Sequence, residues 1–268
     1  MALLALLIPL LFSVHQILVR QGSRDAETMS GIYASLMAST LVFLPSILNP
    51  CLDQQFLLYM VAAGVMHFFA ARICFYHAIS RIGANLSAPL SATRVFFAAI
   101  LGTFLGEILT LKTLAMSLLI FTGIFLLSRP SGRIDYIGML FGLLTGLFTA
   151  LSSFLVKFGN HIDYNPMFAA FVGFAISTVL MSPIALKNFS PRSTGWYFVA
   201  GIFAALAHLV RYVVLKDTPV TVVEPITSSY PLFTLALSFI FLREKEVFTK
   251  RAILGTASIL AGIFVYYC

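Results

Sequence analysis

A permanent positive charge interrupts the apolar stretch SATRVFFAAI, residues 91 to 100. A guanidinium keeps its proton in proteins, so Arg94 is charged wherever it lies. Ser87 and Ser91 precede it at a spacing that places all three side chains on one face of a helix. An arginine flanked by hydroxyls on an otherwise apolar face is suited to hold a carboxylate or a phosphate.

A second polar stripe occurs late in the chain. Glu224, Thr227 and Ser228 share a helical face, and Pro225 frees a backbone carbonyl next to the glutamate. We interpret Arg94 as a ligand for an anionic group and Glu224 as a ligand for an amine or a coupling proton. The alternative is that Arg94 and Glu224 pair with each other and only hold two parts of the chain together.

The composition indicates the solvent around these charges. The chain is 60% hydrophobic and 10% charged, with a mean hydropathy of +0.97, whereas a soluble domain carries about 25% charged residues. There is too little polar surface for water, so we expect a multi-pass integral protein of the plasma membrane. An ionisable residue inside a span costs about 2.5 to 3.5 kcal/mol and normally faces the protein interior or a wet cavity.

The apolar segments predict an all-α fold. Runs of roughly 17 to 25 apolar residues can cross a bilayer as helices, and the sequence contains ten of them joined by short charged connectors. The predicted transmembrane helices cover approximately residues 2–20, 28–48, 56–79, 83–105, 109–128, 135–157, 165–185, 195–214, 219–242 and 248–267.

The two halves of the chain resemble each other. LVRQG recurs as LVKFG after 137 positions, Tyr76 recurs as Tyr212 after 136, and TGIF recurs as AGIF after 139. We therefore expect two five-helix repeats, residues 1–131 and 132–268. Because five is odd, the second repeat begins on the opposite side of the membrane. Inverted repeats are typical of transporters that work by alternating access around a central site between the halves.

The same offset pairs further polar residues. Arg72 corresponds to His208 and Tyr76 to Tyr212, and in each helix the two residues share a face. Side chains with an aromatic body and a polar tip suit a small-molecule cavity. The alternative for Arg72 is that it lies near the membrane surface and extends its charge into water.

Histidines inside the predicted helices are candidates of another kind. His15 corresponds to Ser152 at an offset of 137, and His67 is a further intramembrane histidine. Histidine titrates near neutral pH, so His67 and Glu224 are candidates for proton coupling. A hydrogen-bonded packing role is the alternative for any single histidine. The candidate substrate-binding residues are Arg94, Glu224, Ser91, Ser87, Ser228, Arg72, Tyr76, His208, Tyr212, His15 and Ser152.

Enzyme and metal signatures are missing from the sequence. There is no zinc-protease, serine-hydrolase or phosphate-loop motif, and the three cysteines lack metal or redox spacing. We expect no catalytic residue, no metal, no cofactor and no nucleic-acid partner. The GxxxGxxxG motif of Gly138, Gly142 and Gly146 indicates close helix contacts, either within one bundle or in a homodimer.

The sequence resembles the EamA-type members of the drug/metabolite transporter superfamily. The resemblance rests on Arg20 and Lys157, which close the first helix of each half, on LGE and LREKE after the fourth and ninth helices, and on TGIF and AGIF. It covers essentially the whole chain and implies a ten-helix transporter of small metabolites. Where that family usually has a proline in the fourth helix, this chain has Arg94, whereas the ninth helix keeps Pro231.

We therefore expect a secondary transporter whose solute is an amino acid or another carboxylated metabolite. One rival is a proton-coupled exporter of drugs or organic cations, and another is a membrane assembly subunit without transport activity. The distribution of Lys and Arg over the connectors favours both termini outside the cell, whereas the resemblance implies both termini in the cytoplasm. The solute, its direction, the coupling ion and the choice between monomer and homodimer stay open.

Overall fold

A computed structural model describes residues 6–103, 110–127, 135–191, 193–217, 226–242 and 248–267. Every regular element within these ranges is helical, which confirms the predicted all-α class. The elements are α2 (Leu7–Gly22), α3 (Thr28–Phe43), η1 (Leu44–Leu48), α4 (Gln54–Gly64), η2 (Val65–Ala71), α5 (Arg72–Ile82), α6 (Ala84–Ala92), α7 (Arg94–Thr103), α8 (Leu111–Leu127), α9 (Tyr136–Ile162), α10 (Pro166–Ala185), η3 (Leu186–Asn188), α11 (Gly195–Asp217), α13 (Tyr230–Phe241) and α14 (Lys250–Tyr267).

Several of these helices are suited to a bilayer. In the described part of the chain, four are long and apolar enough to cross a membrane: Thr28–Leu48, Gln54–Ile82, Tyr136–Ile162 and Pro166–Ala185. The first consists of α3 and η1, and the second of α4, η2 and α5. The chain is therefore an integral membrane protein, while the total of ten crossings stays a prediction.

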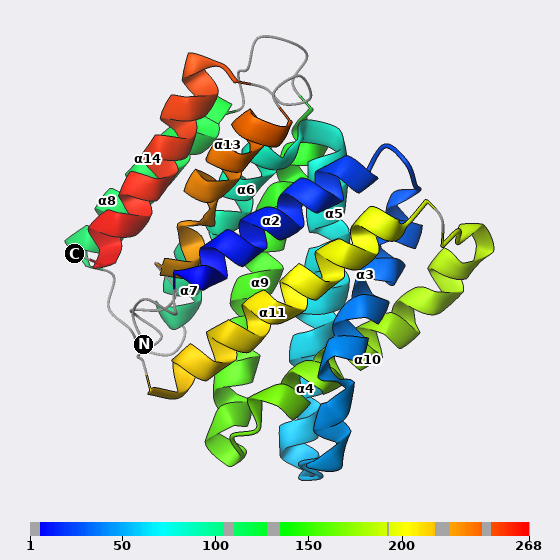
Figure 1. Cartoon of the computed structure of the whole chain (residues 1–268). Coiled ribbons are helices and arrows are strands. Elements are labelled where there is room, and N and C mark those ends of the chain that lie inside the picture. Colours follow the sequence, from blue (N-terminus) through cyan, green and yellow to red (C-terminus); the bar gives the residue numbers. More distant parts are fainter. Residues whose placement is uncertain are drawn as a thin grey trace.

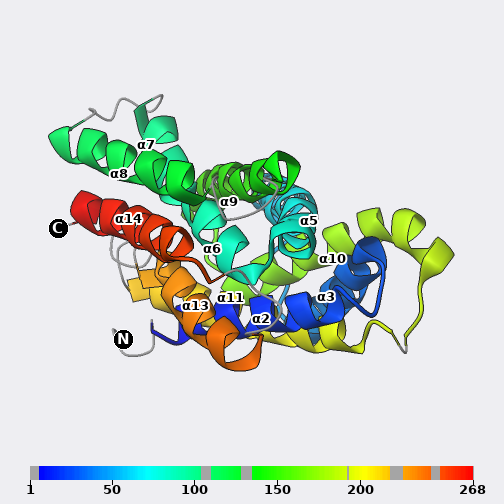
Figure 2. The same ribbon diagram turned by 90° about the horizontal axis from the view of Figure 1, so that it is seen from above.

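The helices of the two predicted repeats interleave in one bundle. The first described helix, α2, packs against α11 and α13 from the second half of the chain (Figure 1). The helix α9 of the second half packs against α4 and α5 of the first. The pair α8 and α14 lies at one edge of the molecule, as the view from above shows (Figure 2). Because partners come from both halves, the space between the helices is lined by residues far apart in the sequence.

The glycine motif on α9 is used inside this bundle. A Cβ added at Gly142 would lie 2.8 Å from the Cβ of Leu90, and one added at Gly146 would lie 3.1 Å from the backbone nitrogen of Arg94. Both positions let α9 approach the junction of α6 and α7 closely. In this structure the motif thus serves packing within the chain.

Two helices are interrupted at corresponding positions. Thr93 separates α6 from α7, and Ser229 interrupts the helix over residues 226–241; the two positions differ by 136. At each interruption the hydroxyl donates to the carbonyl three residues earlier, with oxygen–oxygen distances of 2.6 Å for Thr93 and 2.7 Å for Ser229. Interrupted helices of this kind leave backbone groups available beside a transporter cavity.

Asp135 fixes the beginning of α9. Its carboxylate accepts from the backbone N–H of Gly138 at 2.9 Å and pairs with Arg81 at 2.9 Å. Partial burial raises the pKa of Asp135, but the Gly138 N–H and the Arg81 guanidinium outweigh it and hold the pKa below its ordinary value.

We expect Asp135→Ala to cost about 1 kcal/mol of folding free energy, because the helix loses its N-cap. Arg81→Ala removes only the half-exposed ion pair and should cost less. Since the folded-state pKa is the lower one, the contribution of Asp135 is present above the unfolded pKa and disappears as the pH falls through the folded value. Thermal unfolding midpoints of the three proteins in detergent should converge in acid; an equal loss in both variants at neutral pH would contradict the capping role.

Candidate functional site

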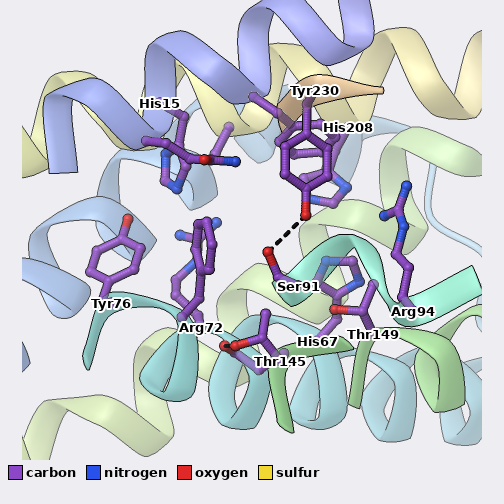
Figure 3. Close-up of a pocket in the computed structure, with 15 residues that line it drawn as sticks. His15, His67, Arg72, Tyr76, Ser91, Arg94, Thr145, Thr149, His208 and Tyr230 are labelled. Atoms are coloured by element: carbon purple, nitrogen blue, oxygen red, sulfur yellow. Dashed lines mark hydrogen bonds between the residues drawn. The ribbon is translucent and has the colours of Figure 1, made fainter. Parts of the chain in front are cut away.

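A central cavity lies between helices of both halves (Figure 3). It contains about 80 Å³ of free volume, less than the roughly 300 to 1,000 Å³ of pockets that enclose drug-sized ligands. In this conformation the cavity therefore fits a small solute. Its lining residues are Phe12, His15, Gln16, His67, Ala71, Arg72, Phe75, Tyr76, Ser91, Arg94, Thr145, Thr149, Ala204, His208 and Tyr230.

A change of helical winding orients two of the lining side chains toward the cavity. The segment η2 is a π-helix between α4 and α5. In an α-helix each residue turns about 100°, so His67 and Arg72 would point away from each other. In a π-helix the hydrogen bonds join residues five apart, which returns such residues to roughly the same side. Both side chains consequently line one cavity.

Neighbouring hydroxyls support the backbone at both ends of η2. Ser152 donates to the carbonyl of Ala63 at 3.0 Å, and Ser177 donates to the carbonyl of Gly64 at 3.1 Å. At the other end the Thr145 hydroxyl lies 3.5 Å from a backbone carbonyl of η2. Irregular winding leaves carbonyls poorly paired inside a bilayer, and these side chains compensate for that cost.

Arg72 is a buried cation with neutral partners. Its side chain is 7% exposed, its Nη1 donates to the Ser35 hydroxyl at 3.0 Å, and its Cζ lies 5.3 Å from the ring centroid of Phe174. Tyr76 donates to the same Ser35 oxygen at 2.6 Å. Among the described residues no carboxylate contacts Arg72. The guanidinium thus lies in the cavity wall and not at the membrane surface, and its contacts among the described residues are all neutral.

Carboxylates in the described part of the chain lie away from the cavity. Asp25, Glu27, Asp53, Asp135 and Asp163 are at helix ends or in connectors, and none of them lines the cavity. The described lining therefore carries the cationic groups Arg72 and Arg94 and neutral polar groups. Such a surface favours an anionic group over a cationic one.

The two interrupted helices meet across the cavity. The hydroxyls of Ser91 on α6 and Tyr230 on α13 are 2.7 Å apart (Figure 3), and Arg94 donates from Nε to the Ser228 hydroxyl at 3.2 Å. Figure 3 places Arg72 and Tyr76 toward one end of the cavity and Arg94 toward the other. Two hydrogen bonds between helices of different halves thus close one wall.

The three cavity histidines differ in their surroundings. Nδ1 of His15 lies 2.9 Å from the carbonyl oxygen of Ala200. A carbonyl only accepts, so Nδ1 of His15 carries a hydrogen and Nε2 of the neutral ring is an acceptor. The rings of His67 and His208 meet edge to face, with centroids 5.0 Å apart.

Most of the predicted site residues come together in this cavity. His15, His67, Arg72, Tyr76, Ser91, Arg94 and His208 line it. The other serines do not: Ser228 contacts Arg94 from behind, Ser152 supports η2, and the Ser87 hydroxyl donates to the Ala84 carbonyl at 3.3 Å. Glu224 and the side chain of Tyr212 lie outside the described residues.

Sequence reasoning missed several polar lining residues. Tyr230 follows Arg94 by 136 residues, the same offset by which Tyr212 follows Tyr76, so the sequence contained a signal for Tyr230 beside Pro231. Gln16 is adjacent to His15, and Thr145 and Thr149 are one turn apart beside the α9 glycines. Ser35 lies behind the cavity and contacts it only through Arg72 and Tyr76, so no local pattern marks it.

We expect Ser35→Ala to destabilise the protein by about 2 kcal/mol or more, because two buried donors, on Arg72 and Tyr76, lose their common acceptor. Tyr76→Phe removes a donor together with its hydrogen bond and should cost only about 1 kcal/mol. Thermal unfolding of both variants in detergent tests this order. A larger loss for Tyr76→Phe would mean that Ser35 is not the organising group.

Comparison with known proteins gives consistent matches along the whole chain. The sequence model of the EamA-like transporter family matches residues 1–129 and, separately, residues 136–268. An uncharacterized transporter from Archaeoglobus fulgidus is 24% identical over 272 positions, covering 98% of this chain and 94% of that protein. An uncharacterized protein from Methanocaldococcus jannaschii is 26% identical over 132 positions, covering 47% of this chain and 93% of its own. A solved crystal structure superposes with a TM-score of 0.70 at 14% identity over 98% of this chain and 94% of that one, which shows a shared fold.

Proposed function

The chain belongs to the EamA-like transporter family, and we propose that this membrane transporter moves a small carboxylated solute, an amino acid or another organic acid, by alternating access. In this proposal, residues 1–131 and 132–268 are two inverted five-helix repeats, and the cavity between them opens to each side of the membrane in turn. The two separate family matches and the half-length archaeal relative support the division into repeats.

The choice of solute rests on the burial of Arg72 and on the groups that contact it. This arginine is buried in the cavity wall and is held by a serine hydroxyl and aromatic rings. A buried charge whose described contacts are all neutral is costly, and a protein keeps such a charge where it is used. A carboxylate in the cavity would complete the missing half of a charge-assisted, two-pronged hydrogen bond.

The cation-exporter alternative needs a negative group in the cavity. The described lining offers none, and Glu224, the residue that would supply it, lies outside the described residues. The small free volume also favours a metabolite over a drug-sized cation. These features support the anion as the preferred solute.

A ligand screen of the purified full-length protein in detergent tests the proposal. Panels of organic acids, amino acids, sugars and organic cations are compared by their effect on the thermal unfolding midpoint. A solute at about 100 times its Kd adds about 2.7 kcal/mol of stability, so binding acids should raise the midpoint clearly. Stabilisation by cations alone would refute the anionic solute, and stabilisation by sugars alone would refute it as well.

A further inference from the structure

His67 and His208 form a contact pair beside Arg72. His67 comes from η2 and His208 from α11, and their rings meet edge to face with centroids 5.0 Å apart. The His208 side chain is 2% exposed and touches Phe68 and Phe174. The same two phenylalanine rings contact the Arg72 guanidinium. The histidine pair and the proposed anion site therefore share one aromatic wall.

The described side chains around the pair are cationic or neutral. In the described part of the structure, the titratable and charged groups around it are His15 on α2, Arg72 and Tyr76 on α5, Arg94 on α7, Arg211 on α11 and Tyr230 on α13. A further positive charge on either imidazole is repelled by these arginines in a site with little water. A bound anion would remove much of that repulsion. Proton binding at the pair and anion binding at Arg72 should therefore favour each other.

We propose that the His67–His208 pair takes up one proton when an anion binds at Arg72, so that the protein carries the anion and the proton together. This inference rests on the proposed function. The proton comes from the aqueous side that the cavity faces. It binds the unprotonated ring nitrogen of one of the two neutral histidines. It leaves with the anion on the other side, so a monovalent anion moves without net charge. Neither an oxidant nor a further reactant is needed.

Two features make the pair better suited than His15. The Nδ1–H of His15 is tied to the Ala200 carbonyl, which fixes that ring in one orientation. The pair instead joins the irregular η2 segment to α11, so one ring comes from the first half of the chain and the other from the second half. A proton shared between two elements that move relative to each other is released when they separate.

The linkage between the two ligands gives a measurable slope. If one proton is bound with each anion, the anion affinity falls about tenfold for each pH unit above the range in which the pair titrates. Acetate, lactate and glutamate serve as probes, because their carboxylates stay ionised from about pH 6 to pH 8. Apparent Kd values come from thermal-shift titrations of the full-length protein at about pH 6, 7 and 8.

The variants are His67→Gln and His208→Gln, which keep a polar side chain but bind no proton at neutral pH. His77→Gln is the matched control, since His77 stacks on Phe141 outside the cavity. We expect the wild type and the control to lose affinity toward high pH and at least one of the two other variants to lose this dependence. If one variant does not fold, the other decides.

The outcomes separate the two claims. A wild-type affinity for these acids that is the same at all three pH values overturns proton coupling and leaves the anion site intact. A pH dependence that survives in both glutamine variants overturns the assignment to the pair. If no acid binds the wild type, or if Arg72→Gln binds the acids as tightly as the wild type, the proposed function fails, and the proton inference fails with it.

Discussion

Arg72→Gln is expected to weaken the binding of organic acids by about 10- to 100-fold while the protein still folds. The loss corresponds to a charge-assisted hydrogen bond, worth about 1.5 to 3 kcal/mol. Glutamine removes a buried charge, and the bond from Tyr76 to Ser35 can persist without the arginine. The measurement is the apparent Kd from thermal-shift titration with the acids that stabilise the wild type.

Two further variants control this result. Arg72→Lys keeps the charge but loses the planar fork, so its affinity should fall between those of the wild type and Arg72→Gln. Arg81→Gln removes a cation from the same helix, outside the cavity, where it pairs with Asp135; its affinity should equal that of the wild type. An Arg81 effect as large as the Arg72 effect would indicate a general electrostatic contribution and not a binding site.

Gly201→Ala is expected to destabilise the protein strongly. A Cβ at this position would collide with the carbonyl oxygen of Ser35 and would lie 2.8 Å from the Ser35 Cα. Backbone atoms cannot rotate away, so α3 and α11 would have to separate. Overpacking of this kind costs about 1 to 3 kcal/mol, and the shift of Ser35 should also disturb the orientation of Arg72.

Gly195→Ala provides the matched control on the same helix, because an added Cβ there has no neighbour within 4 Å. Thermal unfolding in detergent should show a strongly lowered midpoint for Gly201→Ala and little change for Gly195→Ala. The anion affinity of the folded Gly201→Ala protein should be reduced as well. Equal midpoints in the two variants would contradict the close crossing of α3 and α11.

Much of the fold could be predicted from the sequence because the apolar segments that indicate it are long. Apolar runs of transmembrane length predicted the all-α membrane class, and the described helices fall within or near the predicted ranges. The offset of about 136 residues identified His208 from Arg72, and both side chains line the cavity. In the proposed arrangement of two inverted repeats, corresponding helices take equivalent places around a central site, so the offset pairs residues that line it.

The parts that sequence reasoning missed depend on local backbone geometry. No sequence pattern predicted the π-helix. In a regular α-helix, His67 and Arg72 would point to different sides. Ser152 and Ser87 were predicted to face the solute, but their hydroxyls satisfy backbone carbonyls instead. A serine in a membrane helix can do either, and the choice depends on which carbonyl its neighbours leave available.

Uptake of a radiolabelled organic acid into proteoliposomes tests the central claim most directly. The acid is the one that stabilises the purified protein best, and vesicles with wild type, Arg72→Gln and no protein are compared at equal protein incorporation. The anion-transporter account predicts saturable uptake with the wild type and uptake near the protein-free level with Arg72→Gln. Uptake by Arg72→Gln at the wild-type rate and half-saturation would contradict it, because the buried cation would then take no part in holding the solute.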